Sequence, residues 1–283
     1  MKIVFMGSST FAIPSLRILK QGQYDVEAVY TQPPRKAGRG KSYREVPVAE
    51  FAFSEGIKVE QPQTFDDPHA LAVLNSYNPD FLVVVAYGLI LPREVLEIPK
   101  KYCINVHASF LPFWRGAAPI NQVIFNRDPY TGVSIIKMSE ELDAGPILCQ
   151  EKVVLDHTET FGFLHQLLSE LGAKNLFKTL SNINAVEEML QNDNLATYAP
   201  KIKKLDAKLD FNHQAYTLEA KIRGLAPSPG AWFEYKKERF KVFSAEVVEG
   251  KGKAGSIIEE NLTIACGEKA LKIYEIQRQG KGV

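Results

Sequence analysis

Three polar residues lie where they could together carry out acyl transfer. Asn105 and His107 are two residues apart in the short apolar stretch 103–107, CINVH. Because side chains alternate between the faces of a strand, both are predicted to project to the same side. Asp143 follows in LDAG, close to a glycine that allows a tight turn. An amide donor, a group that can carry a proton near neutral pH and an orienting carboxylate are what transfer of an acyl group requires.

Each of the three residue types has a place in the attack of an amine on a formyl carbon. An amide N–H aimed at the developing oxyanion is worth roughly 10²–10³-fold in rate, and a histidine that shuttles the proton is worth about 10²–10⁴-fold. Taken singly, His107 is equally a core histidine, Asn105 a strand-end cap and Asp143 a turn former. The spacing of the first two, together with the next segment, favours the catalytic interpretation.

That next segment, residues 109–119, reads SFLPFWRGAAP. Pro112 and Pro119 restrict the backbone, and Trp114 and Arg115 place an aromatic ring and a cation in a loop that leads into a helix. A helix N-terminus and an arginine suit an anionic ligand.

The elements around these residues alternate between strand and helix. This alternation predicts an α/β fold with a doubly wound, mostly parallel, Rossmann-like sheet and a site at the carboxyl ends of its strands. The first turn, GSST, lacks the GxGxxG spacing, which disfavours a dinucleotide-binding oxidoreductase. Strands are predicted at residues 2–6, 26–30, 57–61, 81–87, 103–107, 132–138 and 147–155, and helices at 11–21, 46–55, 67–76, 117–125 and 160–180.

The pattern changes near residue 206. A helix at 214–223 is followed by short β-like runs separated by glycine turns, which predicts a smaller, OB-like β-barrel domain. We therefore expect a catalytic domain at 1–191, a linker at 192–205 and a C-terminal β-barrel domain at 206–283. The predicted strands of the barrel are 231–235, 239–248, 254–260, 262–267 and 270–277.

Length and composition fit a two-domain globular protein. The 283 residues are 45% hydrophobic and 24% charged, with a net charge of +1. Residues 198–283 hold 16 Lys and Arg against 11 Asp and Glu. This excess suits an anionic macromolecular partner, although lysine is also simply a common surface residue.

The three widely spaced cysteines, Cys103, Cys149 and Cys266, indicate inert buried thiols rather than disulfides or a zinc site. Neither a signal peptide nor a membrane span is evident, so we expect a cytoplasmic protein without membrane association.

Residues 31–47, TQPPRKAGRGKSYREVP, carry five cations against one acid. Such a stretch is expected to be a mobile surface loop. It is either a plain solvated connection or a flexible cationic arm that closes on phosphates.

Several motifs are familiar together. FxGSSxFA at 5–12, TQP and AGRGK within 31–41, VVAYGLILP at 84–92, INVHASFLPFWRGAAPI at 104–120 and LDAG at 142–145 span nearly the whole chain. This set resembles the methionyl-tRNA formyltransferases, within the 10-formyltetrahydrofolate-dependent formyltransferase family. The Asn-x-His and Asp set is shared by that wider family, whereas AGRGK and YGLILP are more specific to the tRNA enzymes.

The resemblance implies transfer of a formyl group from 10-formyltetrahydrofolate to the amino group of methionyl initiator tRNA, for translation initiation. It implies no metal, no nicotinamide and no obligate protein partner, with the basic barrel holding part of the tRNA. The implied catalytic residues are Asn105, His107 and Asp143. The implied folate-binding residues are Val85, Ala86, Tyr87, Gly88, Leu89, Ile90, Leu91, Pro92, Ser109, Leu111 and Pro112. The implied tRNA or acceptor contacts are Phe11, Arg35, Lys36, Arg39, Lys41 and Arg115.

The chain departs from the family pattern at Ala108, where glycine is commoner, and at Phe113, where a basic residue is usual. Members of the family often extend beyond the position of residues 279–281, so we expect that a last strand or tail is missing here. Two alternatives remain at this point. One is a formyltransferase for a small acceptor such as glycinamide ribonucleotide or an amino sugar nucleotide, and the other is a non-catalytic RNA-binding protein that keeps the fold.

Overall fold

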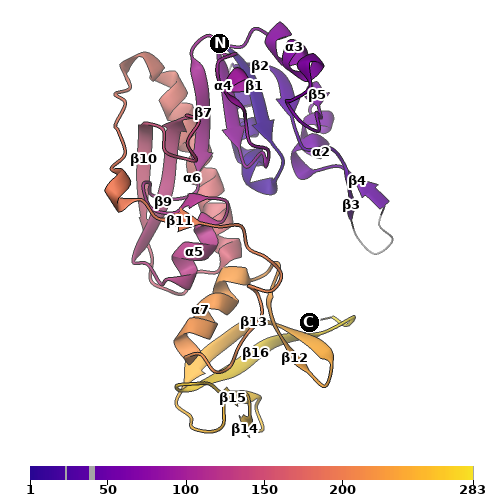
Figure 1. Cartoon of the computed structure of the whole chain (residues 1–283), viewed down its shortest axis with the longest axis vertical. Coiled ribbons are helices and arrows are strands. Elements are labelled where there is room, and N and C mark those ends of the chain that lie inside the picture. Colours follow the sequence, from indigo (N-terminus) through magenta and orange to yellow (C-terminus); the bar gives the residue numbers. More distant parts are fainter. Residues whose placement is uncertain (23, 38–41, 283) are drawn as a thin grey trace. The chain divides into compact units, whose positions relative to one another are not determined.

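The structure is a computed structural model that describes residues 1–22, 24–37 and 42–282. The chain divides into two compact units, each with a sheet of its own (Figure 1). No helix among the described residues is long and apolar enough to cross a membrane. The first unit comprises Met1–Arg115, Gly132–Lys152 and Gln166–Thr197, and the second comprises Gly116–Thr131, Val153–His165 and Tyr198–Val283.

A seven-stranded sheet forms the centre of the first unit, in the order β10-β9-β7-β6-β1-β2-β5. Strand β1 pairs in parallel with β2 and β6, β6 pairs in parallel with β7, and β7 pairs antiparallel with β9. The sheet is therefore mostly parallel, which confirms the predicted Rossmann-like fold class. The strands are β1 (Lys2–Gly7), β2 (Asp25–Tyr30), β5 (Val59–Glu60), β6 (Phe81–Val85), β7 (Tyr102–His107), β9 (Tyr130–Lys137) and β10 (Ile147–Val154).

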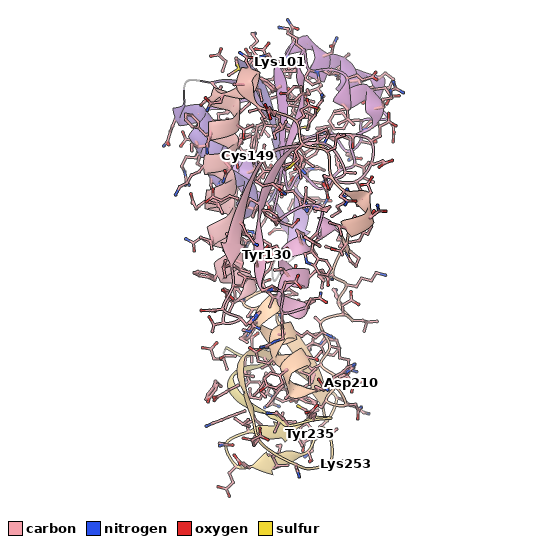
Figure 2. The ribbon with its side chains drawn as sticks, turned by 90° about the vertical axis from the view of Figure 1, so that its left-hand side faces the viewer. Lys101, Tyr130, Cys149, Asp210, Tyr235 and Lys253 are labelled. Carbon is pink, nitrogen blue, oxygen red and sulfur yellow. The ribbon has the colours of Figure 1, made fainter. Side chains whose placement is uncertain are left out.

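The central strand β6 is apolar throughout, as FLVVV. All five residues of β6 are buried, as expected of a strand inside a parallel sheet. Helix α6 packs beside β10, where the Cys149 thiol donates to Asn175 Oδ1 at 3.2 Å (Figure 2). The helices of this part of the chain are η1 (Thr10–Ala12), α1 (Ile13–Gln21), α2 (Pro47–Ser54), α3 (Pro68–Ser76), α4 (Arg93–Leu96), α6 (Phe161–Ser181), η2 (Ile183–Ala185) and η3 (Asp193–Leu195).

The predicted helix starts are visible as side-chain caps. Ser9 Oγ accepts from the Phe11 N–H at 3.2 Å at the entry to η1 and α1. Asp67 Oδ1 accepts from the His69 N–H at 2.9 Å at the start of α3. Each cap satisfies a backbone donor that the first helical turn cannot satisfy itself.

The described part of residues 31–47 contains regular structure that was not predicted. Strands β3 (Arg35–Ala37) and β4 (Ser42–Arg44) pair antiparallel as a hairpin, and Thr31 and Gln32 are buried. This pairing satisfies backbone polar groups that the composition alone leaves open. The mobility expected of the segment stays a prediction. Arg39 and Lys41 lie outside the described residues.

The second unit contains a five-stranded antiparallel sheet in the order β12-β13-β16-β15-β14. Its core joins this sheet to helix α7 through Leu218, Ile222, Trp232, Val242 and Leu271. The strand count and the leading helix agree with the predicted small β domain. The elements are α5 (Pro119–Phe125), α7 (Ala215–Leu225), β12 (Ala231–Tyr235), β13 (Glu238–Val248), β14 (Ile257–Glu259), β15 (Thr263–Ala265) and β16 (Ala270–Arg278), with β8 (Arg115–Gly116) and β11 (Tyr198–Ala199) forming a further two-stranded pair.

Candidate active site

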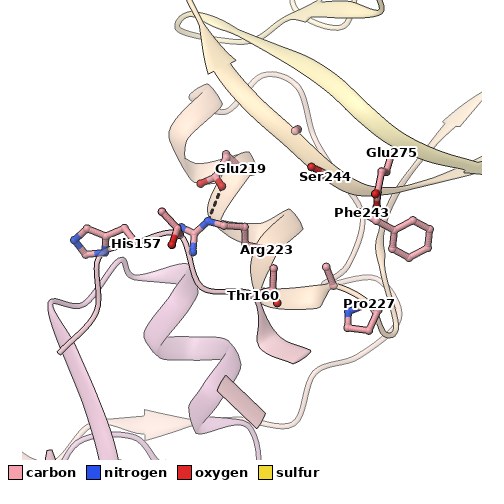
Figure 3. A pocket seen from close by; sticks show the side chains of 11 residues that line it. His157, Thr160, Glu219, Arg223, Pro227, Phe243, Ser244 and Glu275 are labelled. Carbon is pink, nitrogen blue, oxygen red and sulfur yellow. Dashed lines mark hydrogen bonds and ion pairs between the residues drawn. The ribbon is translucent and has the colours of Figure 1, made fainter. Parts of the chain in front are cut away.

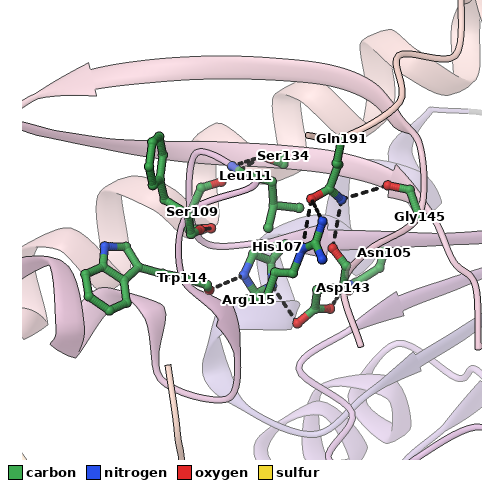
Figure 4. A network of polar contacts seen from close by, with 11 residues as sticks. Asn105, His107, Ser109, Leu111, Trp114, Arg115, Ser134, Asp143, Gly145 and Gln191 are labelled. Atoms are coloured by element: carbon green, nitrogen blue, oxygen red, sulfur yellow. Dashed lines mark hydrogen bonds and ion pairs between the residues drawn. The ribbon is translucent and has the colours of Figure 1, made fainter. Parts of the chain in front are cut away.

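The structure brings Asn105, His107 and Asp143 together at the end of β7. Asn105 Nδ2 donates to Asp143 Oδ1 at 3.2 Å, and His107 Nδ1 lies 3.6 Å from Asp143 Oδ2 (Figure 4). The side chains of His107 and Asp143 are only 7% and 13% exposed. Charges and hydrogen bonds act more strongly in such a partly dehydrated position than in bulk water. The period-2 spacing on β7 thus places an amide and an imidazole around one carboxylate.

The hydrogen bond of His107 Nε2 indicates which of the two ring nitrogens is free to exchange a proton. His107 Nε2 lies 2.9 Å from the carbonyl oxygen of Trp114. A carbonyl oxygen only accepts, so Nε2 carries the proton in this contact. In the neutral ring Nδ1 is then unprotonated, and it faces Asp143. The arrangement suits an imidazole that gains and loses its proton at Nδ1.

Asn105, His107 and Asp143 are called the trio from here on. The backbone near them adopts unusual conformations. Asp143 has a φ of 50° and Trp114 a φ of 61°, in the left-handed region that non-glycine residues rarely occupy. Gly145 approaches its neighbour so closely that an added Cβ would lie 1.8 Å from the carbonyl oxygen of Lys137. Backbone strain of this kind gathers at functional sites, where the surrounding structure must maintain it.

The loop after β7 is braced by Ser134 of β9. Ser134 Oγ donates to the Ser109 carbonyl at 2.7 Å and accepts from the Leu111 N–H at 3.1 Å. Ser109 Oγ donates to the Phe113 carbonyl at 2.6 Å. Ser109 and Leu111, both predicted to contact the folate, are each 1% exposed. They stabilise the conformation of the loop through these hydrogen bonds. Pro112, the third predicted contact in this loop, is half-buried.

Arg115 is buried and paired within the fold. Its side chain is 3% exposed, and its Nη2 donates to Asp193 Oδ1 at 2.6 Å and to Gln191 Oε1 at 2.9 Å. The sequence did not indicate this burial, because a charged residue in a loop is usually solvated. The contact of Arg115 with the acceptor stays a prediction.

Gln191 is a site residue that the sequence did not reveal. Its Nε2 donates to the carbonyl oxygens of Asp143 and Gly145, each at 2.8 Å. Gln191 lies 48 residues after Asp143, and at the edge of the segment that was expected to be a linker. No local pattern marks it, since its contacts are set by the tertiary fold.

The predicted folate loop, residues 85–92, alternates between anchors and exposed positions. Tyr87 and Leu91 are buried in the core that contains Leu82, whereas Ile90 is 95% exposed. Ala86 and Gly88 are also exposed and have φ values of 45° and 85°. Val85 is buried at the end of β6, and Leu89 and Pro92 are half-buried.

Two contacts tie this loop to its surroundings. Ser8 Oγ donates to the Tyr87 carbonyl at 2.8 Å. Arg93 Nε lies 3.6 Å from Glu140 Oε1, so the loop and the segment that carries Asp143 are neighbours.

The predicted acceptor contacts occupy different environments. Phe11 is 6% exposed at the turn after β1. Arg35 is exposed on β3, and its guanidinium donates to Gln32 Oε1. Lys36 contributes its backbone to β3, and its side chain lies outside the described residues, as do Arg39 and Lys41.

A separate pocket of 720 Å³ lies within the second unit (Figure 3). Its chemistry is dominated by the pair of Arg223 and Glu219, in which Arg223 Nε donates to Glu219 Oε1. None of the predicted site residues that the structure describes lines it. The lining residues are His157, Thr158, Thr160, Glu219, Arg223, Ala226, Pro227, Phe243, Ser244, Ala245 and Glu275.

The cysteines are free, as expected. Burial raises the pKa of the Cys103 thiol to about 12 and that of Cys266 to about 11. Both thiols are therefore protonated at neutral pH, and a protonated thiol is a poor nucleophile and metal ligand.

Family models match both parts of the chain. The model described as "Formyl transferase" matches residues 1–180, and the one described as "Formyl transferase, C-terminal domain" matches residues 201–283. A methionyl-tRNA formyltransferase from Ruegeria pomeroyi is 42% identical over 281 residues, covering 99% of this chain and 93% of the relative. One from Caulobacter vibrioides is 41% identical and covers 100% of this chain and 94% of the relative.

Solved structures share the fold at lower identity. A methionyl-tRNA formyltransferase from Clostridium thermocellum gives a TM-score of 0.64 at 17% identity, covering 98% of both chains. HypX from Aquifex aeolicus in complex with tetrahydrofolic acid gives 0.68 at 19% identity, covering 99% of this chain. The present chain spans 45% of the length of that HypX chain. An N-formyltransferase from Helicobacter canadensis gives 0.73 at 18% identity, covering 98% of this chain and all of that one.

Proposed function

Since this chain belongs to the formyl transferase family, we propose that it transfers a formyl group from 10-formyltetrahydrofolate to the amino group of methionine esterified to initiator tRNA. The observation that carries the proposal is the convergence of Asn105, His107 and Asp143 at the carboxyl end of β7. The names of the relatives at 41% and 42% identity supply the acceptor.

In the proposed reaction the donor supplies the formyl carbon and the aminoacyl amine attacks it. Negative charge grows on the formyl oxygen, and the amide of Asn105 donates to it. One N–H of that amide already binds Asp143, so the second is the proposed oxyanion donor. The contact with Asp143 fixes the orientation of the amide before substrates bind.

His107 is the proposed proton carrier in this scheme. The amine must lose a proton to form the new C–N bond, and the nitrogen of the donor must gain one as the old C–N bond breaks. His107 Nδ1 can accept the first proton and return one to the departing nitrogen. Asp143, 3.6 Å from that atom, stabilises the intermediate imidazolium.

The loop at residues 85–92 is the proposed contact for the heteroaromatic ring of 10-formyltetrahydrofolate. Its exposed positions combine the apolar side chain of Ile90 with accessible backbone at Ala86 and Gly88, and ligand sites commonly pair apolar walls with a few backbone groups. The contact of Arg93 with Glu140 brings this loop beside the Asp143 segment. The proposed donor contacts remain those of this loop together with Ser109, Leu111 and Pro112.

The hairpin β3–β4 and its cations are the proposed contacts for the acceptor. Arg35, Lys36, Arg39 and Lys41 are numerous enough to grip several phosphates, and Phe11 is proposed to lie near the methionyl group. A second contact through the basic C-terminal residues would make binding strongly salt-dependent.

The experiment is a formylation assay on the purified protein, with 10-formyltetrahydrofolate and three acceptors: charged initiator tRNA, glycinamide ribonucleotide and an amino sugar nucleotide. We expect turnover only with the charged tRNA, and a steep fall in its apparent affinity between low and moderate salt. Preferred turnover of a small amine, or tRNA binding without any formyl transfer, would overturn the proposal.

A further inference from the structure

The segment at residues 188–197, which we call the strap, contacts two neighbours of the trio: the loop that binds His107 and the turn that carries Asp143. Met189 and Ile147 exchange backbone hydrogen bonds of 2.8 and 2.9 Å, so the strap begins with an antiparallel bridge to the first residue of β10. Further along, Thr197 Oγ1 accepts from the Trp114 N–H at 2.8 Å. The carbonyl oxygen of Trp114 in turn accepts a hydrogen bond from His107 Nε2. The strap therefore lies against the loop that fixes the histidine.

Its residue Gln191 lies against the segment that carries the carboxylate. Gln191 Nε2 donates to the carbonyls of Asp143 and Gly145, each at 2.8 Å. Its Oε1 accepts from Arg115 Nε at 3.1 Å and from Nη2 at 2.9 Å (Figure 4). All four hydrogen-bonding positions of this one amide are in use.

The partners also fix the orientation of the amide. Rotating it by 180° would set the NH₂ group against guanidinium N–H groups and the oxygen against two carbonyl oxygens. Arg115 is 3% exposed, so water cannot readily replace the lost contacts, and unsatisfied buried groups are costly. Gln191 thus joins a buried cation to the backbone of the catalytic segment in one geometry only.

The backbone that Gln191 restrains is that of Asp143, which has an unfavourable conformation. Asp143 has a φ of 50°, and a non-glycine residue keeps a left-handed conformation only when its surroundings impose it. The two donations from Gln191 fall on the carbonyls of Asp143 itself and of Gly145, on either side of Ala144. They restrain the turn from which the carboxylate reaches Asn105 and His107.

We infer that Gln191 is a positioning residue for formyl transfer, an inference that rests on the function proposed above. It does not touch the reacting atoms. By holding the Asp143 turn, it sets the distance between the carboxylate and His107 Nδ1.

The test uses Gln191→Glu, which keeps the length of the side chain and an acceptor for Arg115 but removes both N–H donors. We expect kcat to fall by about 10–100-fold, because misplacement of a catalytic group by an ångström costs up to about 10²-fold. KM for the charged tRNA and for the formyl donor should stay within about threefold, since neither substrate contacts Gln191. The midpoint of thermal unfolding should fall, because one oxygen of the new carboxylate faces two carbonyl oxygens, so kcat and KM are measured well below that midpoint.

The matched control is Glu188→Gln, which removes the ion pair of Glu188 with Lys137 at 3.0 Å from the same strap. Both partners are more than a third exposed, and such pairs contribute little. This variant should retain kcat within about twofold. If Gln191→Glu does not fold, Gln191→Met, which adds no buried charge, is measured in the same way.

The outcomes separate this inference from the function itself. If the parent protein formylates no charged tRNA, the proposed function fails and the inference fails with it. If the parent protein is active, equal kcat values for it and for the Gln191 variant would overturn the positioning role. A rise in KM with unchanged kcat would also overturn it, because that result indicates a binding residue.

Discussion

The end of β7 and the pocket of the second unit differ in the polar groups that they bring together and in the conformation of their backbone. The pocket has a volume of 720 Å³, and its partly buried charges, Arg223 and Glu219, are paired with each other. At the end of β7 an amide, an imidazole and a carboxylate meet, and Asp143 and Trp114 have left-handed backbones. We propose that the chemistry is located by convergent polar groups on a constrained backbone rather than by the size of a hollow.

The largest predicted difference between the two regions concerns their histidines. His107→Ala should lower kcat by about 10²–10⁴-fold, because the proton carrier is lost, while tRNA binding in a filter or fluorescence assay is retained. His157→Ala, at the pocket of the second unit, is the control and should leave kcat unchanged. Comparable losses from both variants would break the comparison.

A second prediction separates stability from catalysis. Glu219→Ala leaves Arg223, whose side chain is 11% exposed, without its carboxylate. We expect the free energy of unfolding in urea to fall by about 3 kcal/mol, whereas kcat of the folded protein stays near its parent value. Glu275→Ala removes an exposed carboxylate from the same pocket and should change neither. A large loss of kcat from Glu219→Ala with unaltered stability would assign chemistry to the pocket.

The smallest predicted effect concerns the thiols, which lie outside both regions. Burial raises the pKa of Cys103 to about 12 and that of Cys266 to about 11. Only the thiolate is alkylated, so the folded protein at pH 8 should react with iodoacetamide at neither residue, and the rate should rise as the pH approaches these values. Mass spectrometry of the modified peptides measures this, with the half-buried Cys149 as the internal comparison. Rapid alkylation of Cys266 at pH 8 would show that the thiol is not buried as described.

Much of the fold was predictable because its signals are local. The apolar run of β6 and the caps at Ser9 and Asp67 each lie within a few residues of the element that they define. The shared face of Asn105 and His107 follows from the two-residue period of a strand. Such features depend on steric and hydrogen-bonding rules that act over short stretches of chain.

The remaining features depend on contacts between distant segments. Gln191 reaches Asp143 across 48 residues, and the buried guanidinium of Arg115 donates hydrogen bonds to Gln191 and Asp193. The β3–β4 hairpin likewise depends on pairing that a sequence rich in proline, glycine and cations does not indicate. The position of Asp143 beside His107 was expected from the family resemblance rather than from any spacing along the chain.

The most direct test of the account is the single-turnover rate of formyl transfer by Asp143→Asn, measured with saturating 10-formyltetrahydrofolate and charged initiator tRNA. This change keeps the size of the side chain and removes the charge 3.6 Å from His107 Nδ1. We predict a fall of about 10²-fold or more with both substrates still bound. A rate near that of the parent protein would contradict the assignment of the chemistry to these three residues.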